Sequence, residues 1–183
     1  MEPSDLTKLF NQKIEYYKNF QGPSERISWD EYFFNLSYLV AERSPDGQTK
    51  HGAVIVDPCN RITATGYNGF PSGGPDKFLP NLRPEKYPYM VHAEMNALIS
   101  SRCDLSGHSV YITGFPCKSC LLHMVAAGIR KVFCGTRSYQ ENAACAHVKA
   151  VLCESYGVSV YVHSTDDKSR IQPFDPKSWL LTT

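Results

Sequence analysis

Cys117 and Cys120, in the stretch FPCKSC, are the side chains of this sequence whose type and spacing most directly suggest chemistry. Residues i and i+3 of a helix project to one side, so both sulfurs can reach one ion. Pro116 fits immediately before a helix, and a helix N-terminus lowers the pKa of a thiol. The spacing alone is compatible with a redox dithiol, with half of a structural zinc site and with part of a catalytic site.

His92 and Glu94, in the stretch VHAEMNAL, stand earlier in the chain at the start of another predicted helix. Two such residues point about 200° apart inside a helix, and they reach one pocket together only at a helix end. A structural zinc site needs four protein ligands, and the sequence has no second C-x-x-C pair. We therefore predict one catalytic zinc ion per chain, held by His92, Cys117 and Cys120 with water in the fourth position, and Glu94 beside it to move protons.

Each of these residues has a structural interpretation when taken alone. A single histidine such as His92 is more often a hydrogen-bonded core residue, and a single Glu94 is more often a surface or capping residue. H-x-E followed by P-C-x-x-C is, however, the signature of zinc-dependent nucleobase deaminases. His123 is the nearest rival ligand, but it lies one helical turn beyond Cys120 and has no partner of its own. The other cysteines lack ligand spacing, and we expect small buried hydrophobic residues at Cys59, Cys103, Cys134, Cys145 and Cys153.

The first elements that must position this group are a helix and a hairpin. Ser28 and Glu31 have the spacing of a capping box and predict a helix over 28–44, with four residues turned inward: Phe33, Leu36, Leu39 and Val40. Two β-rich runs, 51–57 and 61–68, predict a hairpin. Residues 69–90 hold several prolines and glycines and predict a long loop, which is often functional in a compact domain.

Helices and strands then alternate along the chain. We predict helices over 92–102, 117–128 and 139–154, strands over 109–115, 129–135 and 157–163, a stop at Gly128, and a second capping box at Ser138 and Glu141. This order indicates an α/β sheet with helices on both faces. We divide the chain into an N-terminal extension (1–27) with an amphipathic helix over 5–20, a zinc domain (28–163) and a loosely packed C-terminal tail (164–183).

Composition limits the classes of function. The chain has 183 residues, which suits one domain, and a net charge of +1 with a pI near 7.6, so it has no general attraction for nucleic acid or anionic membranes. It has no apolar run of membrane-spanning length and no secretory leader, so we expect cytoplasmic residence. Seven cysteines in that reducing compartment favour metal or catalytic use over disulfides.

Residues 28–162 resemble the deoxycytidylate (dCMP) deaminases of the cytidine deaminase superfamily. The resemblance rests on the segments SWDEYFFNLSYLVAERS, HGAVIVD, GYNGFPSG, KYPYMVHAEMNAL and AAGIRKV, of which GYNGFPSG and YPYMVHAEMNA separate this family from more distant deaminases. It implies a three-layer α/β/α cytidine-deaminase-like fold with a central mixed sheet of about five strands. It also implies that water activated by zinc attacks C4 of cytosine while Glu94 passes a proton to N3 and then to the departing amine, so that dCMP becomes dUMP, the precursor of dTMP, and ammonia.

The resemblance further implies contacts with the nucleoside. Asn68 would contact the sugar, the Ala93 amide would hold the cytosine O2, and Phe115 would pack on the base. Asn68 is also a good turn residue, and Phe115 is also an ordinary core aromatic, so these alternatives stay open.

A monophosphate needs cationic or amide donors. The segment ERSPDGQTKHG offers Arg43, Ser44 and Lys50 as candidates, although surface cations are usually only solvated. His51, in the same segment, replaces a residue that is more often valine in the family.

Many family members are hexamers that are activated by dCTP and inhibited by dTTP near the G-Y-N-G loop, and this chain retains Gly69, Gly73 and Asp76 there. We therefore expect a homo-oligomer, with Mg²⁺ accompanying a triphosphate effector.

Two alternative substrates stay open. A modified or differently phosphorylated cytosine nucleotide (5-methyl-dCMP, dCTP) is one, because a single methyl group changes discrimination by only about 1–3 kcal/mol. A nucleic-acid cytosine is the other, which the balanced charge disfavours. A protein that uses zinc only for structure would tolerate Glu94→Gln.

Overall fold

A computed structural model describes residues 26–137, 142–163 and 171–181, together with the helical positions 7, 8, 11, 12, 14 and 15. The remainder of the predicted helix over 5–20 lies outside the described residues, as do Ser138 and Glu141 of the predicted second capping box. The helix after them begins at Ala143, where the Asn142 side chain accepts a hydrogen bond from the backbone N–H of Cys145.

The described residues form one mixed sheet with the strand order β2-β1-β3-β4-β5-β6. β1 pairs antiparallel with both neighbours, β3, β4 and β5 run parallel, and β6 pairs antiparallel with β5. The strands are β1 (Gly52–Val56), β2 (Ile62–Tyr67), β3 (Ser109–Gly114), β4 (Lys131–Arg137), β5 (Ser159–His163) and β6 (Ile171–Phe174). The predicted hairpin is confirmed as β1 and β2, which join through a turn that includes Asn60 at φ 61°.

The expectation of about five strands is wrong by one, because it omits β6. This strand is short and contains Pro173, which a sequence pattern assigns to a loop. Proline is tolerated at a sheet edge, where only one side of the strand needs a donor, and β6 is the last strand in the order.

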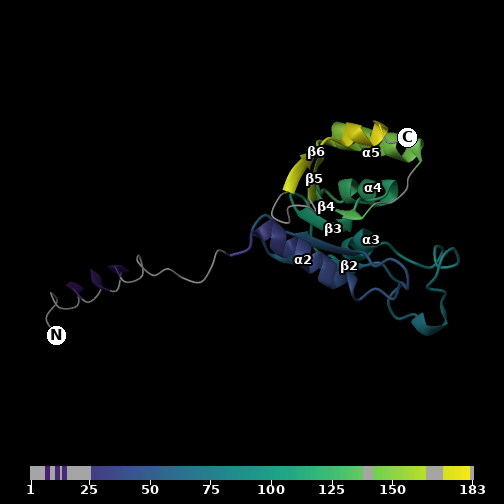
Figure 1. The fold of residues 1–183 in the computed structure, drawn as a ribbon, viewed down its shortest axis with the longest axis horizontal. Coiled ribbons are helices and arrows are strands. Elements are labelled where there is room, and N and C mark those ends of the chain that lie inside the picture. The colour runs from purple at the N-terminus through teal and green to yellow at the C-terminus, as the bar shows by residue number, and fades with distance from the viewer. Residues whose placement is uncertain are drawn as a thin grey trace.

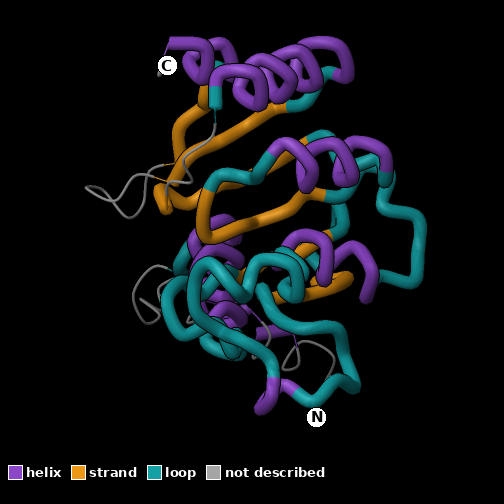
Figure 2. Tube along the Cα trace, turned by 90° about the vertical axis from the view of Figure 1, so that its right-hand side faces the viewer, coloured by secondary structure: helices purple, strands orange, loops and turns teal. Residues whose placement is uncertain are grey.

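Helices cover both faces of the sheet, which confirms the three-layer α/β/α architecture (Figures 1 and 2). α2 (Trp29–Ala41) packs on one face through Phe33 and Phe34, which meet Val54 and Val56 of β1 and Tyr111 of β3. α3 (Ala93–Ser100), α4 (Lys118–Ala126) and α5 (Ala143–Tyr156) lie on the other face. Alternate residues of β1 therefore belong to opposite layers, as the two-residue repeat of a strand requires.

The capping box of α2 is confirmed, since Ser28 Oγ accepts a hydrogen bond of 3.1 Å from the backbone N–H of Glu31. One of its four predicted inward residues is wrong, because Leu39 is 67% exposed. Phe34 is buried instead, because the helix lies over the sheet along the side that carries Phe33 and Phe34.

The C-terminal segment does not pack loosely, contrary to our expectation. After β6, the 3₁₀ helix η2 (Pro176–Leu181) lies along α5, as Figure 1 shows. Trp179 is only 8% exposed, and its ring centroid is 4.2 Å from Nζ of the buried Lys149 on α5. One aromatic anchor therefore holds this segment, and a single tryptophan in a polar stretch leaves no periodic signal in the sequence.

The remaining cysteines divide by their position in the fold. Cys134 and Cys153 are buried as predicted, but Cys59 and Cys103 are exposed, contrary to the prediction, because they lie in polar connections between elements. No helix in the described part of the chain combines the length and the apolar character that a bilayer span needs.

Candidate active site

Two helix N-termini meet at the carboxyl end of β3. His92 is the N-cap of α3 and Cys117 is the N-cap of α4, as the sequence predicted for both helix starts. α3 approaches β2 so closely that a Cβ on Gly66 would collide with the backbone of Ala93 and Ala97. Glycine at this position therefore lets the first turn of α3 lie directly on the sheet beside the start of α4.

His92, Cys117 and Cys120 converge on one point, and their ligand atoms all lie within 4.8 Å of one another. Nδ1 of His92 is 3.5 Å from Sγ of Cys117 and 3.4 Å from Sγ of Cys120. Zinc–nitrogen and zinc–sulfur bonds at a tetrahedral angle separate nitrogen and sulfur by about 3.6 Å. The three side chains therefore fit a zinc ion that has a fourth position for a non-protein ligand.

The two thiols have different acidities. Hydrogen bonds from Cys120 and His92 hold the pKa of Cys117 at about 4, against the effect of burial. The hydrogen bond to Cys117, together with burial, raises the pKa of the Cys120 thiol. The hydrogen bond with Cys117 likewise raises the pKa of His92, although burial opposes it. Cys117 is thus a thiolate at neutral pH, the form in which a thiol binds a metal ion.

Glu94 lies in the first turn of α3, and only 9% of its surface is exposed. Burial raises the pKa of its carboxyl, because a charged carboxylate is poorly solvated there, while His92 acts in the opposite direction. A carboxyl with a raised pKa takes up a proton more readily than an exposed one, which suits a group that exchanges protons with a bound substrate.

One cavity connects this group with the neighbouring loops. Its lining consists of Asp46, Thr49, His51, Asn68, Arg83, Lys86, Tyr87, Met90, His92, Ala93, Glu94, Phe115 and Cys117. Glu94 and the metal-binding side chains thus share one space with residues of the loops before β1 and before α3.

The three predicted nucleoside contacts all lie in this cavity. Ala93 forms the wall next to Glu94, and Phe115 is half-buried, with its ring centroid 5.1 Å from that of Phe174. Asn68 is already bonded on both sides: its Oδ1 accepts from the His51 backbone N–H at 2.7 Å, and its Nδ2 donates to Asp46 Oδ2 and to the Thr49 carbonyl. Asn68 Oδ1 keeps its second lone pair, which can accept a hydrogen bond from a sugar hydroxyl.

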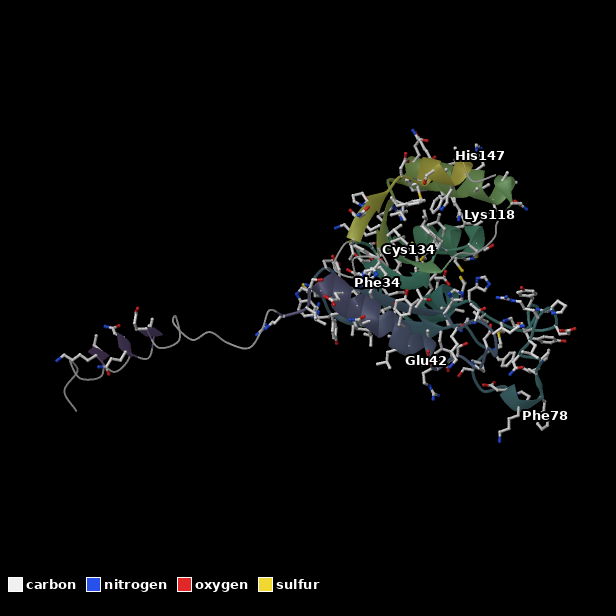
Figure 3. The ribbon with its side chains drawn as sticks, viewed as in Figure 1. Phe34, Glu42, Phe78, Lys118, Cys134 and His147 are labelled. Carbon is white, nitrogen blue, oxygen red and sulfur yellow. The ribbon has the colours of Figure 1, made fainter. Side chains whose placement is uncertain are left out.

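The three predicted phosphate contacts do not line the cavity. Arg43 is exposed beyond the end of α2, Ser44 donates its hydroxyl proton to the Asn68 carbonyl, and Lys50 Nζ is 2.8 Å from Glu42 Oε2. Glu42, the ion-pair partner of Lys50, is labelled in Figure 3 at the end of α2. Lys118, labelled in the same figure, marks the start of α4.

Sequence reasoning missed several residues of the cavity wall. Asp46 lies in SPDG, where the predicted first helix of the domain ends, and Arg83 and Lys86 lie in the proline-rich loop; none of the three stands in a spacing that marks a site. His51 also lines the cavity, with Nδ1 3.1 Å from Thr113 Oγ1. The departure of His51 from the family's usual valine was the one signal that pointed to this wall.

The loop predicted to bind effectors projects away from the sheet and carries the short helix η1 (Asp76–Phe78), as Figure 1 shows. Phe78 is 87% exposed near the tip of this loop (Figure 3). Gly69 pairs with Val91, Gly73 has a φ of 84° and lines a surface hollow, and Asp76 is exposed.

Known proteins similar to this chain are deaminases. The sequence profile of the cytidine and deoxycytidylate deaminase zinc-binding region matches residues 27–136. The deoxycytidylate deaminase of Mus musculus is 38% identical over 123 residues, which span 63% of this chain and 69% of the mouse protein. The probable deoxycytidylate deaminase of Drosophila melanogaster is 34% identical over 183 residues, spanning 93% of this chain and 88% of the fly protein.

Among solved structures, the dCMP deaminase of the cyanophage S-TIM5 in complex with dCMP and dUMP superimposes with a TM-score of 0.60 at 26% identity. The superposition covers 76% of this chain and 99% of the phage chain.

Proposed function

The chain belongs to the cytidine and deoxycytidylate deaminase family, and from that premise we propose that it catalyses the hydrolytic deamination of dCMP to dUMP and ammonia. The relatives bear the name of this activity, and the phage neighbour was solved with dCMP and dUMP. The observation that carries the proposal is the buried carboxyl of Glu94 in one cavity with His92 and Cys117, two of the three side chains that converge on one point.

The three side chains of His92, Cys117 and Cys120, called the metal group here, fit a zinc ion. A zinc ion held by them would act as a Lewis acid that lowers the pKa of water to about 7. The role of this chain is to hold the ion through three side chains on two helix N-termini. Because these three side chains and Glu94 come from two helix starts, their arrangement relative to one another is set before the substrate binds.

Glu94 handles the protons of the reaction. Its carboxylate takes one proton from the attacking water and delivers it to N3 of cytosine, and it then takes the second proton, from the hydroxyl now on C4, and delivers it to the departing amine. Burial raises the pKa of this carboxyl, so it holds a proton more readily than an exposed glutamate does, as a group that must both accept and return a proton requires.

Three other residues orient the nucleoside. The backbone N–H of Ala93 donates to the cytosine O2, the ring of Phe115 packs on the base, and Asn68 Oδ1 accepts a hydrogen bond from a sugar hydroxyl. Each lies in the cavity wall, and the bonds of Asn68 to Asp46 and Thr49 fix its amide in one orientation.

The direct test combines zinc analysis with a panel of substrates. We expect about one zinc ion per chain and loss of cytosine absorbance with dCMP, and a much smaller rate with CMP, dCTP and deoxycytidine. If 5-methyl-dCMP or dCTP is turned over faster than dCMP, that nucleotide is the substrate in place of dCMP. Zinc-loaded protein that deaminates none of these compounds would exclude the proposal.

We also propose, from the family resemblance, that dCTP with Mg²⁺ activates and dTTP inhibits the enzyme at the loop with Gly69, Gly73 and Asp76, within a cytoplasmic homohexamer. The surface hollow lined by Pro71, Gly73 and Tyr89 supports an additional ligand at this loop. Sigmoidal dCMP saturation that becomes hyperbolic with dCTP is expected. Hyperbolic saturation that neither nucleotide alters would exclude regulation, and sedimentation of a monomer would exclude the hexamer.

A further inference from the structure

We propose that Arg83 recognises the 5′-phosphate of the substrate and so determines the preference for a nucleotide over a nucleoside. This inference rests on the proposed deamination of dCMP, and it assigns the phosphate to a loop residue rather than to Arg43, Ser44 or Lys50.

The cavity wall offers a lysine and an arginine, Lys86 and Arg83. Lys86 Nζ lies 2.6 Å from both carboxylate oxygens of Asp46, and the two side chains are 4% and 3% exposed. The charge of Lys86 is therefore neutralised within the protein, and this ion pair contributes little net attraction for an anion.

Arg83 is in a different electrostatic position. Among the residues that the structure describes, no carboxylate forms an ion pair with Arg83. Its Nη2 donates to Thr49 Oγ1 at 2.8 Å, which engages one of the five N–H groups of the guanidinium. An arginine with its charge uncompensated and a fork of donors at a cavity wall is suited to bidentate binding of a phosphate.

The order of residues along the wall gives the orientation of the nucleotide. Glu94 and the metal group mark the position of the base, and Asn68 marks the position of the sugar. Asn68 Nδ2 is 2.9 Å from the Thr49 carbonyl oxygen, and the Thr49 hydroxyl is bonded to Arg83. A substrate with its sugar at Asn68 therefore directs its 5′ substituent along Thr49 toward Arg83.

The loop that carries Arg83 is held in place before any substrate binds. The Arg83 backbone N–H donates to Gln48 Oε1 at 2.8 Å, the Gly47 N–H donates to the Asn81 carbonyl at 3.3 Å, and the Asp46–Lys86 ion pair joins the same two loops. Such preorganisation reduces the ordering cost of binding.

The two cations of the earlier prediction are poorer candidates. Lys50 is paired with Glu42 at 2.8 Å, and neither Lys50 nor Arg43 lines the cavity. Arg43, which has no such partner among the ion pairs of the described residues, therefore serves as the rival position in the test.

The test compares Arg83→Gln, Arg83→Lys, Arg43→Gln and, as a matched control, Arg102→Gln, at an exposed position just after α3. We expect Arg83→Gln to lower kcat/KM for dCMP by about 10- to 100-fold, because a hydrogen bond to a charged group contributes about 1.5–3 kcal/mol. The value for deoxycytidine should stay within about twofold of wild type, and Arg83→Lys should recover part of the loss. Zinc content and melting temperature check that each variant is folded.

Binding of the product provides a readout that does not need turnover. In calorimetry, Arg83→Gln should weaken dUMP binding and leave deoxyuridine binding unchanged. Equal losses for dCMP and deoxycytidine, unchanged dUMP binding, or a dCMP-selective loss in Arg43→Gln would each overturn the assignment. A wild-type protein that binds dUMP through Arg83 but deaminates no cytosine nucleotide would overturn the proposed function instead.

Discussion

Glu94 is the residue whose substitution best separates catalysis from structure. Glu94→Gln keeps the shape of the side chain and removes the carboxyl that we propose carries the proton. We expect zinc content and melting temperature to stay at wild-type values while kcat for dCMP falls by about 10²- to 10⁴-fold. Glu154→Gln, at an exposed position of α5, is the matched control and should retain full activity. Unchanged kcat in Glu94→Gln would show that another group carries the proton.

Cys117 tests the metal group itself. Cys117→Ser removes the thiol whose low pKa makes it a ligand at neutral pH, so we expect zinc per chain to fall well below that of the wild type and activity to be lost with it. Metal analysis after dialysis measures the first effect. Cys59→Ser changes an exposed cysteine and should alter neither quantity. Full zinc retention by Cys117→Ser would remove Cys117 from the ligand set.

At the scale of elements, the loops before β1 and before α3 are joined by the buried Asp46–Lys86 ion pair. Asp46→Asn leaves the ammonium group of Lys86 without its counter-charge, and breaking a buried pair in this way lowers the free energy of unfolding by about 3–5 kcal/mol. Glu42→Gln, which removes the exposed partner of Lys50, should cost less than about 1 kcal/mol. Urea unfolding near neutral pH measures both. A loss from Asp46→Asn as small as that from Glu42→Gln would contradict the prediction.

The same pair predicts a pH dependence. Burial opposes ionisation of Asp46, but hydrogen bonds from Lys86 and from the Thr49 and Gln48 amides hold its pKa below the ordinary value of 3.8. The stabilisation by Asp46 is therefore complete above about pH 4 and is lost as the pH falls through the lower, folded-state pKa. The difference in unfolding free energy between wild type and Asp46→Asn should stay constant from pH 7 to about pH 5 and shrink below about pH 4. A difference that grows on acidification would show that the sign is wrong.

The C-terminal segment is the second element with a measurable role. Trp179 is buried against Lys149, and its ring centroid lies 6.0 Å from that of Phe115, one side of the cavity wall. Trp179→Ala should lower the free energy of unfolding by about 3–5 kcal/mol, as for other buried tryptophans. Lys177→Ala, on the exposed side of η2, should stay within about 0.5 kcal/mol. Equal stability of the two variants would mean that the segment packs as loosely as its sequence suggests.

At the scale of the whole molecule, the balanced charge bears on the substrate. Deamination of a polynucleotide requires contacts with several phosphates, and the chain has a net charge of only +1. We expect turnover of a cytosine in single-stranded DNA to be negligible beside that of free dCMP at equal cytosine concentration and moderate ionic strength. Comparable rates would shift the substrate class to nucleic acid.

The fold was largely predictable because its elements have local signals. The capping box of α2, the hairpin of β1 and β2 and the positive φ of Gly128 after α4 are set by neighbouring residues. β6 and Trp179 were missed because they are stabilised by contacts distant in sequence, so their residues carry no pattern of their own.

The sequence by itself determined which residue types stand at the candidate metal site and which carboxyl is the candidate for proton transfer. Short-range spacing places four residues in the first turns of two helices: His92, Glu94, Cys117 and Cys120. Only the tertiary structure decided which charges share the cavity with them. Asp46 and Lys86 are separated by 40 positions in the chain, and Arg83 and Thr49 by 34. Contacts of that range depend on how the loop before β1 packs against the loop before α3. No local pattern in the sequence encodes that packing.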